Sequence, residues 1–216
     1  LQIIYPITAR LMNENKHEEL NDLYKKSALN LQVFGGLVLL GIFLNIKELY
    51  KLIPNEYSGG ITVVFIIGLT KFYDVILGNN NAIILNTKYY KTVLFFGLLL
   101  VFMMVGLNML LIPPYVIVGA AWATLIPVMV YNTIKLLFVV KKMNLFPFTK
   151  NTLKSASVIL VVFILFYFWD FSFHPILNIA LKSALITIIY VWINYKLMIS
   201  EEVNEFIDKF LFKTKF

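Results

Sequence analysis

The chain contains no cysteine, only two histidines and few charged residues. Without cysteine it can form neither a disulfide nor a thiolate metal site. His17 and His174 have no partner at metal-ligand spacing. Charged residues make up 14% of the 216 positions, whereas a soluble domain carries about 25%. We therefore expect no metal ion, no cofactor and no ordinary soluble domain.

Catalytic motifs are missing as well. The sequence has no glycine-rich phosphate loop, no nucleophile elbow, no His-Glu metal motif and no aspartate-rich connection. The connections between its apolar blocks are too short to form a soluble catalytic domain. The sequence therefore does not predict an enzyme.

Apolar residues dominate what is present. They make up 60% of the chain and the mean hydropathy is +0.80, whereas a soluble domain has about 45–50% apolar residues. The formal net charge is +7, but the cations are scattered singly between apolar blocks. Because nucleic-acid binding needs a basic face, this pattern argues against such a partner. The composition predicts a membrane protein.

Six apolar blocks are long enough to cross the hydrocarbon core, which takes about 20 residues. They cover residues 27–46, 60–85, 92–112, 116–140, 155–169 and 176–198. Residues 1–9 resemble the end of a seventh span, and the chain starts without methionine, so we expect it to be the C-terminal part of a longer protein. The predicted fold is an all-α, polytopic membrane helical bundle with its six-helix lobe at residues 27–198.

Lysine and arginine residues concentrate in alternate connections, which predicts the orientation in the membrane. The cations on the side predicted to be cytoplasmic are Arg10, Lys16, Lys25, Lys26, Lys88, Lys91, Lys141, Lys142, Lys150, Lys154, Lys196, Lys209, Lys213 and Lys215. The opposite side has only Lys47, Lys51 and Lys182. The positive-inside rule therefore predicts that both ends of the chain are cytoplasmic.

Two amphipathic segments flank the predicted lobe. Residues 1–26 end one membrane helix and continue as a cytoplasmic connector, in which Asn15 and Glu18 have the spacing of a capping box. Residues 199–216 carry apolar residues at helical spacing, with Glu201 and Glu202 in the first turn. We expect this tail to lie along the inner leaflet as an anchor, with contact to a headgroup or partner as the alternative.

Lys71 and Asp74 are charged residues inside an apolar block, three positions apart and so on one helical face. Helical steps continue this face through Gly78 to Asn81. Ionisable residues in a membrane usually serve a substrate pathway. We therefore predict a polar cavity in which Lys71 attracts an anion and Asp74 holds Lys71 or carries a proton. A purely structural ion pair that locks two helices together is the alternative.

Lys135 is a weaker candidate near the predicted cytoplasmic end of its block. It follows Tyr131 and Asn132 by one helical turn. Long basic side chains at such positions commonly extend to the headgroups. We expect Lys135 to do the same, with contact to a substrate as the alternative.

The segment from Leu110 to Thr124 predicts a tight helical hairpin. Pro113 and Pro114 should end one helix. Gly119 and Ala123 then form a small-xxx-small pair, as do Ala120 and Thr124, and such pairs let two helices approach closely in a bilayer. The pattern is typical of a helix inside a bundle.

The order of several motifs resembles the C-terminal half of polysaccharide and O-antigen flippases of the multidrug/oligosaccharidyl-lipid/polysaccharide exporter superfamily. The motifs are Tyr5-Pro6, Asn13-Glu14-Asn15-Lys16-His17-Glu18-Glu19-Leu20, Leu23-Tyr24-Lys25-Lys26, Ile53-Pro54-Asn55-Glu56-Tyr57, Leu111-Ile112-Pro113-Pro114-Tyr115 and Val118-Gly119-Ala120-Ala121-Trp122-Ala123-Thr124. They extend over essentially the whole chain. Pro114-Tyr115-Val116 departs from the family, which has a polar residue, an aromatic residue and glycine there, so the turn should be stiffer.

This resemblance implies a fourteen-helix exporter of the bacterial inner membrane that works by alternating access between two lobes. Its substrate would be an undecaprenyl-diphosphate-linked oligosaccharide. Its other partners would be membrane lipids, the missing N-terminal lobe of the same protein and polysaccharide polymerase machinery. Lys71 and Asp74 would then serve the diphosphate, with Asn81 and Lys135 as further substrate-binding candidates.

Three other functions stay open on the sequence. A drug/cation antiporter of the same superfamily would use acidic cavity residues, of which the block offers one beside a lysine. A peptidoglycan-precursor flippase would share the fold and a similar lipid. A membrane-embedded glycosyltransferase would need an acidic cluster in a connection, which the short connections do not provide.

Overall fold

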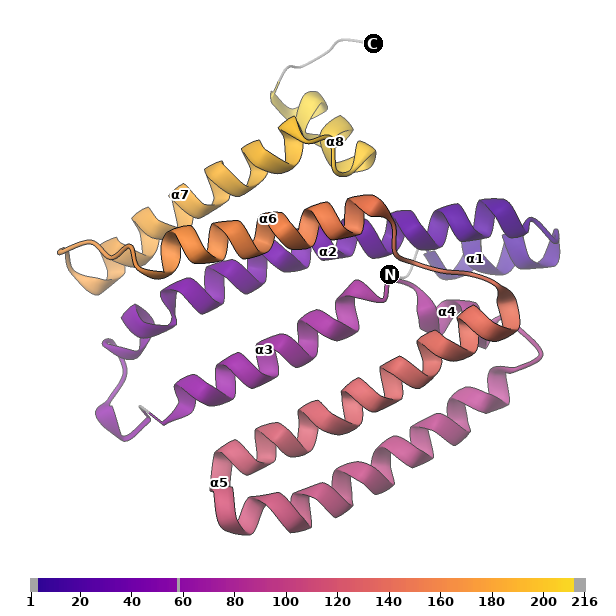
Figure 1. Cartoon of the computed structure of the whole chain (residues 1–216), viewed down its shortest axis with the longest axis horizontal. Coiled ribbons are helices and arrows are strands. Elements are labelled where there is room, and N and C mark those ends of the chain that lie inside the picture. The colour runs from indigo at the N-terminus through magenta and orange to yellow at the C-terminus, as the bar shows by residue number, and fades with distance from the viewer. Residues whose placement is uncertain (1–3, 58, 212–216) are drawn as a thin grey trace. The chain divides into compact units, whose positions relative to one another are not determined.

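The structure is a computed structural model that describes residues 4–57 and 59–211. Every regular element within these residues is a helix (Figure 1). The helices are α1 (Ile4–Asn13), α2 (His17–Tyr50), the 3-10 turn η1 (Asn55–Tyr57), α3 (Gly60–Ile76), α4 (Asn80–Leu85), α5 (Tyr90–Met143), α6 (Lys150–Tyr167), α7 (Pro175–Lys196) and α8 (Glu201–Leu211). The prediction of an all-helical chain is confirmed for this part of the protein.

Four helices, α2, α5, α6 and α7, are long and apolar enough to cross a membrane. Helices α6 and α7 coincide with the last two predicted blocks to within a few residues. Helix α2 runs without interruption from His17 through the first block. The predicted capping box is wrong, because Asn15 lies in the turn before α2 with φ of 54°.

Helix α5 contains the third and fourth predicted blocks, joined by a sharp reversal. At 54 residues it would extend about 80 Å if it were straight. Instead Val116 has non-helical angles (φ 50°, ψ −122°), and Figure 1 shows the two arms folded back on each other. We predicted that Pro113 and Pro114 end the first arm. In the structure they lie within its last turn. Because proline has no backbone N–H, two hydrogen bonds are missing there, and their loss weakens only the end of the arm.

Gly119 lies at a close approach between the backbones of the two arms of α5. A Cβ atom added at this position would lie 2.0 Å from the carbonyl oxygen of Leu111. Any larger residue would push the arms apart. The small-residue pattern in the sequence therefore corresponds to a real backbone contact at Gly119.

The predicted continuous block 60–85 is broken in the structure. Helix α3 ends at Ile76, Gly78 adopts φ of +63°, and the short α4 begins at Asn80. The left-handed angle stops the α-helix and is readily adopted only by glycine. Gly78 also contacts the backbone of Ala28, since a Cβ atom there would lie 3.0 Å from the Ala28 nitrogen. The polar stripe thus does not continue along one helix face.

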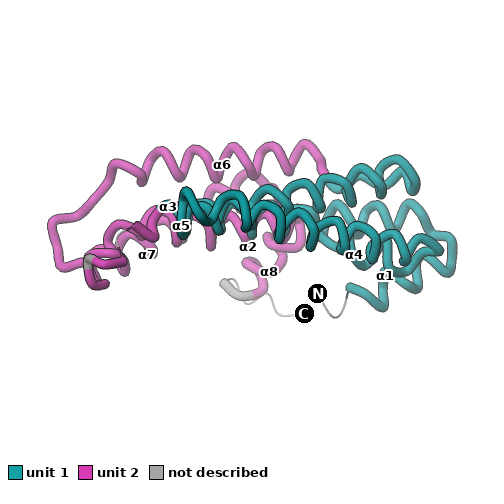
Figure 2. The backbone as a smooth tube through the Cα atoms, turned by 90° about the horizontal axis from the view of Figure 1, so that it is seen from below, with its two compact units in different colours: residues 1–28, 62–147 teal, residues 29–61, 148–216 magenta. Residues whose placement is uncertain are grey.

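The chain forms two compact units (Figure 2). Unit 1 comprises residues 1–28 and 62–147, and unit 2 comprises residues 29–61 and 148–216. Helix α4 is central to unit 1, because Ile83 and Ile84 are fully buried against Tyr24 and Val139. In unit 2, α2 packs on α6 and α7 through Leu40 and neighbouring apolar residues. The buried cluster is Leu29, Val33, Leu40, Leu44, Val158, Val162, Phe166, Ile186, Tyr190 and Ile199.

Candidate functional site

Lys71 and Asp74 lie on α3 in unit 1, and both side chains are exposed. They form no ion pair, and Lys71 has no hydrogen bond to any residue in the described ranges. Asp74 instead accepts a 2.9 Å hydrogen bond from the side-chain amide of Asn132, on the second arm of α5. The predicted contact between Lys71 and Asp74 is therefore wrong, because the neighbouring helix offers Asp74 a better placed donor.

Lys135 is buried, which contradicts its predicted extension to the headgroups. Only 2% of the Lys135 surface is exposed. The ammonium nitrogen donates a 2.8 Å hydrogen bond to the side-chain oxygen of Asn81. It also lies 4.1 Å from the centre of the Tyr131 ring, at cation-π distance. The break at Gly78 makes this possible, because it brings α4 against the second arm of α5.

Few groups compensate the charge of Lys135. An ammonium group has three protons, and the hydrogen bond to Asn81 uses one of them. Within the described residues no carboxylate lies within 4.0 Å of its nitrogen, and the carboxylate of Asp74 is hydrogen-bonded to Asn132 instead. A buried cation without an ion-pair partner is costly. The unused donors of the Lys135 ammonium group therefore suit contact with an anion.

Buried amides surround this part of the chain. Asn79, Asn80 and Asn132 are each 1–2% exposed. Asn79 donates a 3.1 Å hydrogen bond to Thr8, but its side-chain oxygen has no partner among the described residues. The same is true of the Asn132 oxygen and of both polar atoms of Asn80. Buried amides usually have partners, so these four atoms represent unused hydrogen-bonding capacity.

The structure thus rearranges the predicted set of site residues. Asn81 and Lys135 are joined by a hydrogen bond. Asp74 accepts a hydrogen bond from Asn132, which lies one helical turn before Lys135 on α5. Among the described residues, Lys71 forms no hydrogen bond or ion pair with any of them. Tyr131 and Asn132 are contacts that the sequence reasoning did not assign. Their positions four and three residues before Lys135 put all three on one helix face, and that spacing was the available signal.

Unit 2 contains a second buried lysine with a different environment. Lys182 lies 2.9 Å from the carboxylate of Asp170. The buried Glu48 accepts hydrogen bonds from Lys51 and Asn178. Each of these charges has an opposite charge nearby, so neither lysine of this cluster lacks a partner. The hydrogen bond from Asn178 to Glu48 joins α7 to α2. The cluster is best explained as a structural network.

The described residues include no group of three or more metal-ligating side chains. Comparison of the chain with protein-family models, curated proteins and solved structures gave no match.

Proposed function

We propose that this chain is the C-terminal lobe of a membrane exporter that carries an undecaprenyl-diphosphate-linked oligosaccharide across the bacterial inner membrane. The observation that supports an anionic substrate is the buried Lys135, which has an amide and an aromatic ring beside it but no ion-pair partner among the described residues. The diphosphate is the part of such a lipid that cannot cross hydrocarbon unaided. Lys135 is its proposed electrostatic contact.

The broken helix supports a transport role. Transporters commonly bind substrates where a membrane helix is discontinuous, because unwound backbone and helix ends then face a cavity. The break between α3 and α4 lies directly beside Asn81 and the buried amides of Asn79 and Asn80. These amides would bind hydroxyl or phosphate oxygens as the substrate passes. Lys71 is a second, more exposed cation that would meet the substrate first.

The proposed topology has six crossings: α2, the pair α3 and α4, the two arms of α5, α6 and α7. In this arrangement the reversal at Val116 faces the outside, and both ends of the chain face the cytoplasm, as the lysine distribution requires. The amphipathic α8 then lies at the inner surface. Alternating access against an N-terminal lobe completes the mechanism.

A cation antiporter of the same superfamily is the second candidate, and Asp74 favours it. This exposed carboxylate lies near Tyr131, and an acid beside an aromatic ring suits a cationic drug. The buried ammonium of Lys135 would repel such a substrate. The anion exporter therefore explains more of the site.

The test uses cells that lack the exporter gene and carry the full-length protein. Lipid-linked oligosaccharide retained on the cytoplasmic leaflet is measured for wild type, Lys135→Gln, Lys71→Gln and the control Lys154→Gln, an exposed lysine on α6. We expect wild type and Lys154→Gln to clear the lipid, Lys71→Gln to clear it slowly and Lys135→Gln to fail. Glutamine can still donate to Asn81, so folding should be preserved, and protein yield checks this. Full clearance by Lys135→Gln would refute its role, and no accumulation in the null cells would refute the substrate.

A further inference from the structure

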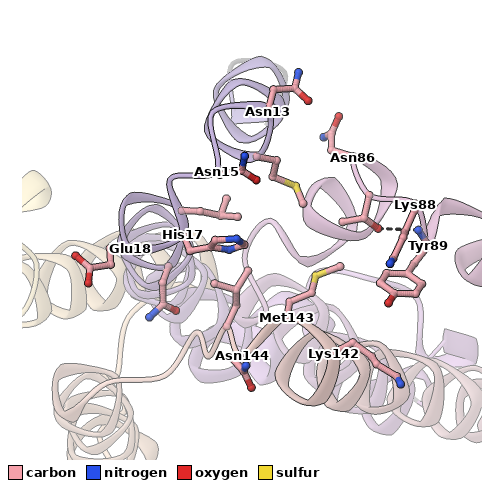
Figure 3. A pocket seen from close by; sticks show the side chains of 15 residues that line it. Asn13, Asn15, His17, Glu18, Asn86, Lys88, Tyr89, Lys142, Met143 and Asn144 are labelled. Atoms are coloured by element: carbon pink, nitrogen blue, oxygen red, sulfur yellow. Dashed lines mark hydrogen bonds between the residues drawn. The ribbon is translucent and has the colours of Figure 1, made fainter.

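A polar pocket of about 730 Å³ lies in unit 1, at the end where three connections meet (Figure 3). The connections are the α1–α2 turn, the loop between α4 and α5, and the segment that follows α5. Its volume falls within the range of small-molecule sites, roughly 300–1,000 Å³. The buried Lys135 does not line it, so it is a separate site.

The charge of this pocket favours an anion. Lys88 and Lys142 both line it and are exposed, and His17 adds a further donor. Glu18 is the one carboxylate among the described residues that line it, and Figure 3 shows its side chain directed away from the His17 ring. Two lysines therefore line the pocket with little compensation from acidic side chains.

Amide groups at the pocket are held in place but unpaired. Asn15 and Asn144 have φ of 54° and 53°, the left-handed conformation that asparagine tolerates at chain reversals. Their side chains, and that of Asn13, make no hydrogen bond with any described residue and are exposed in the pocket lining. Each amide offers two donors and one acceptor oxygen. Such groups suit a ligand with several hydroxyl groups.

One face of the pocket is less polar. The ring of Tyr89 lies beside Lys88, whose nitrogen is 5.3 Å from the ring centre. Met143 lies across the pocket from the Asn13 and Asn86 pair in Figure 3. A flat aromatic ring and a thioether can pack on the apolar face of a sugar while the amides bind its hydroxyls.

We propose that this pocket binds a phosphate ester that carries neighbouring hydroxyl groups, presented at the lysine-rich surface of the membrane. Lys88 and Lys142 bind the phosphate, and His17 and the asparagines bind the hydroxyls. Two headgroups have this chemistry: the glycosyl phosphate of a lipid-linked sugar and the glycerophosphate of a phospholipid. This inference rests on the proposed function for the first source, in which the pocket holds the headgroup before transport.

Binding is tested with the whole chain in nanodiscs of phosphatidylcholine, titrated with N-acetylglucosamine 1-phosphate and followed by calorimetry. Inorganic phosphate and N-acetylglucosamine are titrated separately. We expect the sugar phosphate to bind about tenfold more tightly than either fragment, because both halves of the pocket then contribute. The absence of saturable binding would overturn the proposal, and so would an equal affinity for the sugar alone.

Matched double variants show whether the pocket is responsible. Lys88→Gln/Lys142→Gln should weaken binding of the sugar phosphate about tenfold or more. Lys91→Gln/Lys141→Gln removes the same charge from adjacent exposed positions that do not line the pocket, and should change affinity less than about twofold. Equal weakening by the two pairs would mean general attraction to a basic surface and would overturn the site. His17→Ala should weaken binding by several-fold.

A second set of nanodiscs, containing phosphatidylglycerol, distinguishes the two sources. If this lipid competes with the sugar phosphate in a manner that depends on Lys88 and Lys142, the phospholipid is the natural occupant. If affinity is unchanged, the glycosyl phosphate is. Binding that persists in a protein unable to export oligosaccharide would leave the pocket standing and refute the proposed function. Export without any binding would refute the pocket alone.

Discussion

The ammonium nitrogen of Lys135 and the side-chain oxygen of Asn81 are joined by a 2.8 Å hydrogen bond across a sequence separation of 54 residues. This contact connects α4 to the second arm of α5. It depends on the break at Gly78, without which Asn81 would continue the axis of α3. A buried cation and a helix break are therefore parts of one arrangement.

Asn81→Leu should destabilise the protein by about 1.5–3 kcal/mol, because it leaves the buried ammonium without its hydrogen bond. Thermal unfolding of the detergent-solubilised chain measures the change. Asn108→Leu is the matched control, since among the described residues the Asn108 side chain bonds only to the carbonyl of Met104 in its own helix. The double variant with Lys135→Met should recover part of the loss, because the buried charge is then gone. Additive losses would contradict the coupling.

Gly78→Ala should cost about 1–2 kcal/mol, because an alanine at φ of +63° is strained and its methyl group would meet the backbone of Ala28. The comparison is Gly97→Ala in α5, where a methyl group has no neighbour within 4 Å and alanine favours the helix. Gly97→Ala should be neutral or slightly stabilising in the same unfolding measurement. Two equal melting temperatures would argue against the break between α3 and α4.

Gly119→Ala should separate the two arms of α5 and destabilise the protein by about 1–3 kcal/mol, since the added methyl group overlaps the Leu111 carbonyl oxygen. Gly106→Ala, on the first arm with open space around it, is the control. The separation of spin labels placed on the two arms reports the opening directly. An unchanged distance together with unchanged stability would show that the arms are not in contact there.

Asp170→Ala should destabilise the protein more than Lys182→Met does. Lys182 is buried, its side chain 4% exposed, whereas the side chain of Asp170 is 56% exposed. Removing the acid leaves a buried cation without a partner, at a cost of about 1–3 kcal/mol, while removing the lysine takes the charge away. Glu19→Gln, from an exposed pair with Lys16, should change stability by less than about 0.5 kcal/mol. The reverse order of the two main variants in thermal unfolding would contradict this explanation.

Single cysteines test the proposed orientation. Glu56→Cys and Val116→Cys, both at exposed positions, should react with an impermeant maleimide added to intact cells. Asn144→Cys should react only after the membrane is opened. Reaction of Asn144→Cys from outside would overturn the topology, and protection of Val116→Cys alone would overturn the crossing of the α5 arms.

Helix content and helix length followed from local pattern. Long apolar stretches bounded by polar turns specify helices wherever backbone groups must be paired within one segment. The positions of α6 and α7, and the presence of two arms within 90–143, could therefore be read from hydropathy. The polar residues of the site could also be identified in this way, because a lysine, an aspartate or a run of asparagines is conspicuous inside an apolar block.

The contacts among those residues could not be predicted from the sequence. The sequence indicated Lys71 with Asp74, because i and i+3 positions share a face, yet the structure pairs Asp74 with Asn132 and Lys135 with Asn81. Helical spacing describes neighbours on one element only. It cannot show which side chain a second helix presents, and that helix decided both partners.

By itself, the sequence determined that this protein is helical, that it has long apolar segments suited to a membrane, and which few polar groups lie among the apolar ones. These properties depend on local hydrogen bonding and on the solvent preference of each residue. Only the tertiary structure decided that the chain breaks at Gly78 and that Lys135 is buried. Each of these depends on contacts between residues far apart in the chain, where packing overrides the local preference.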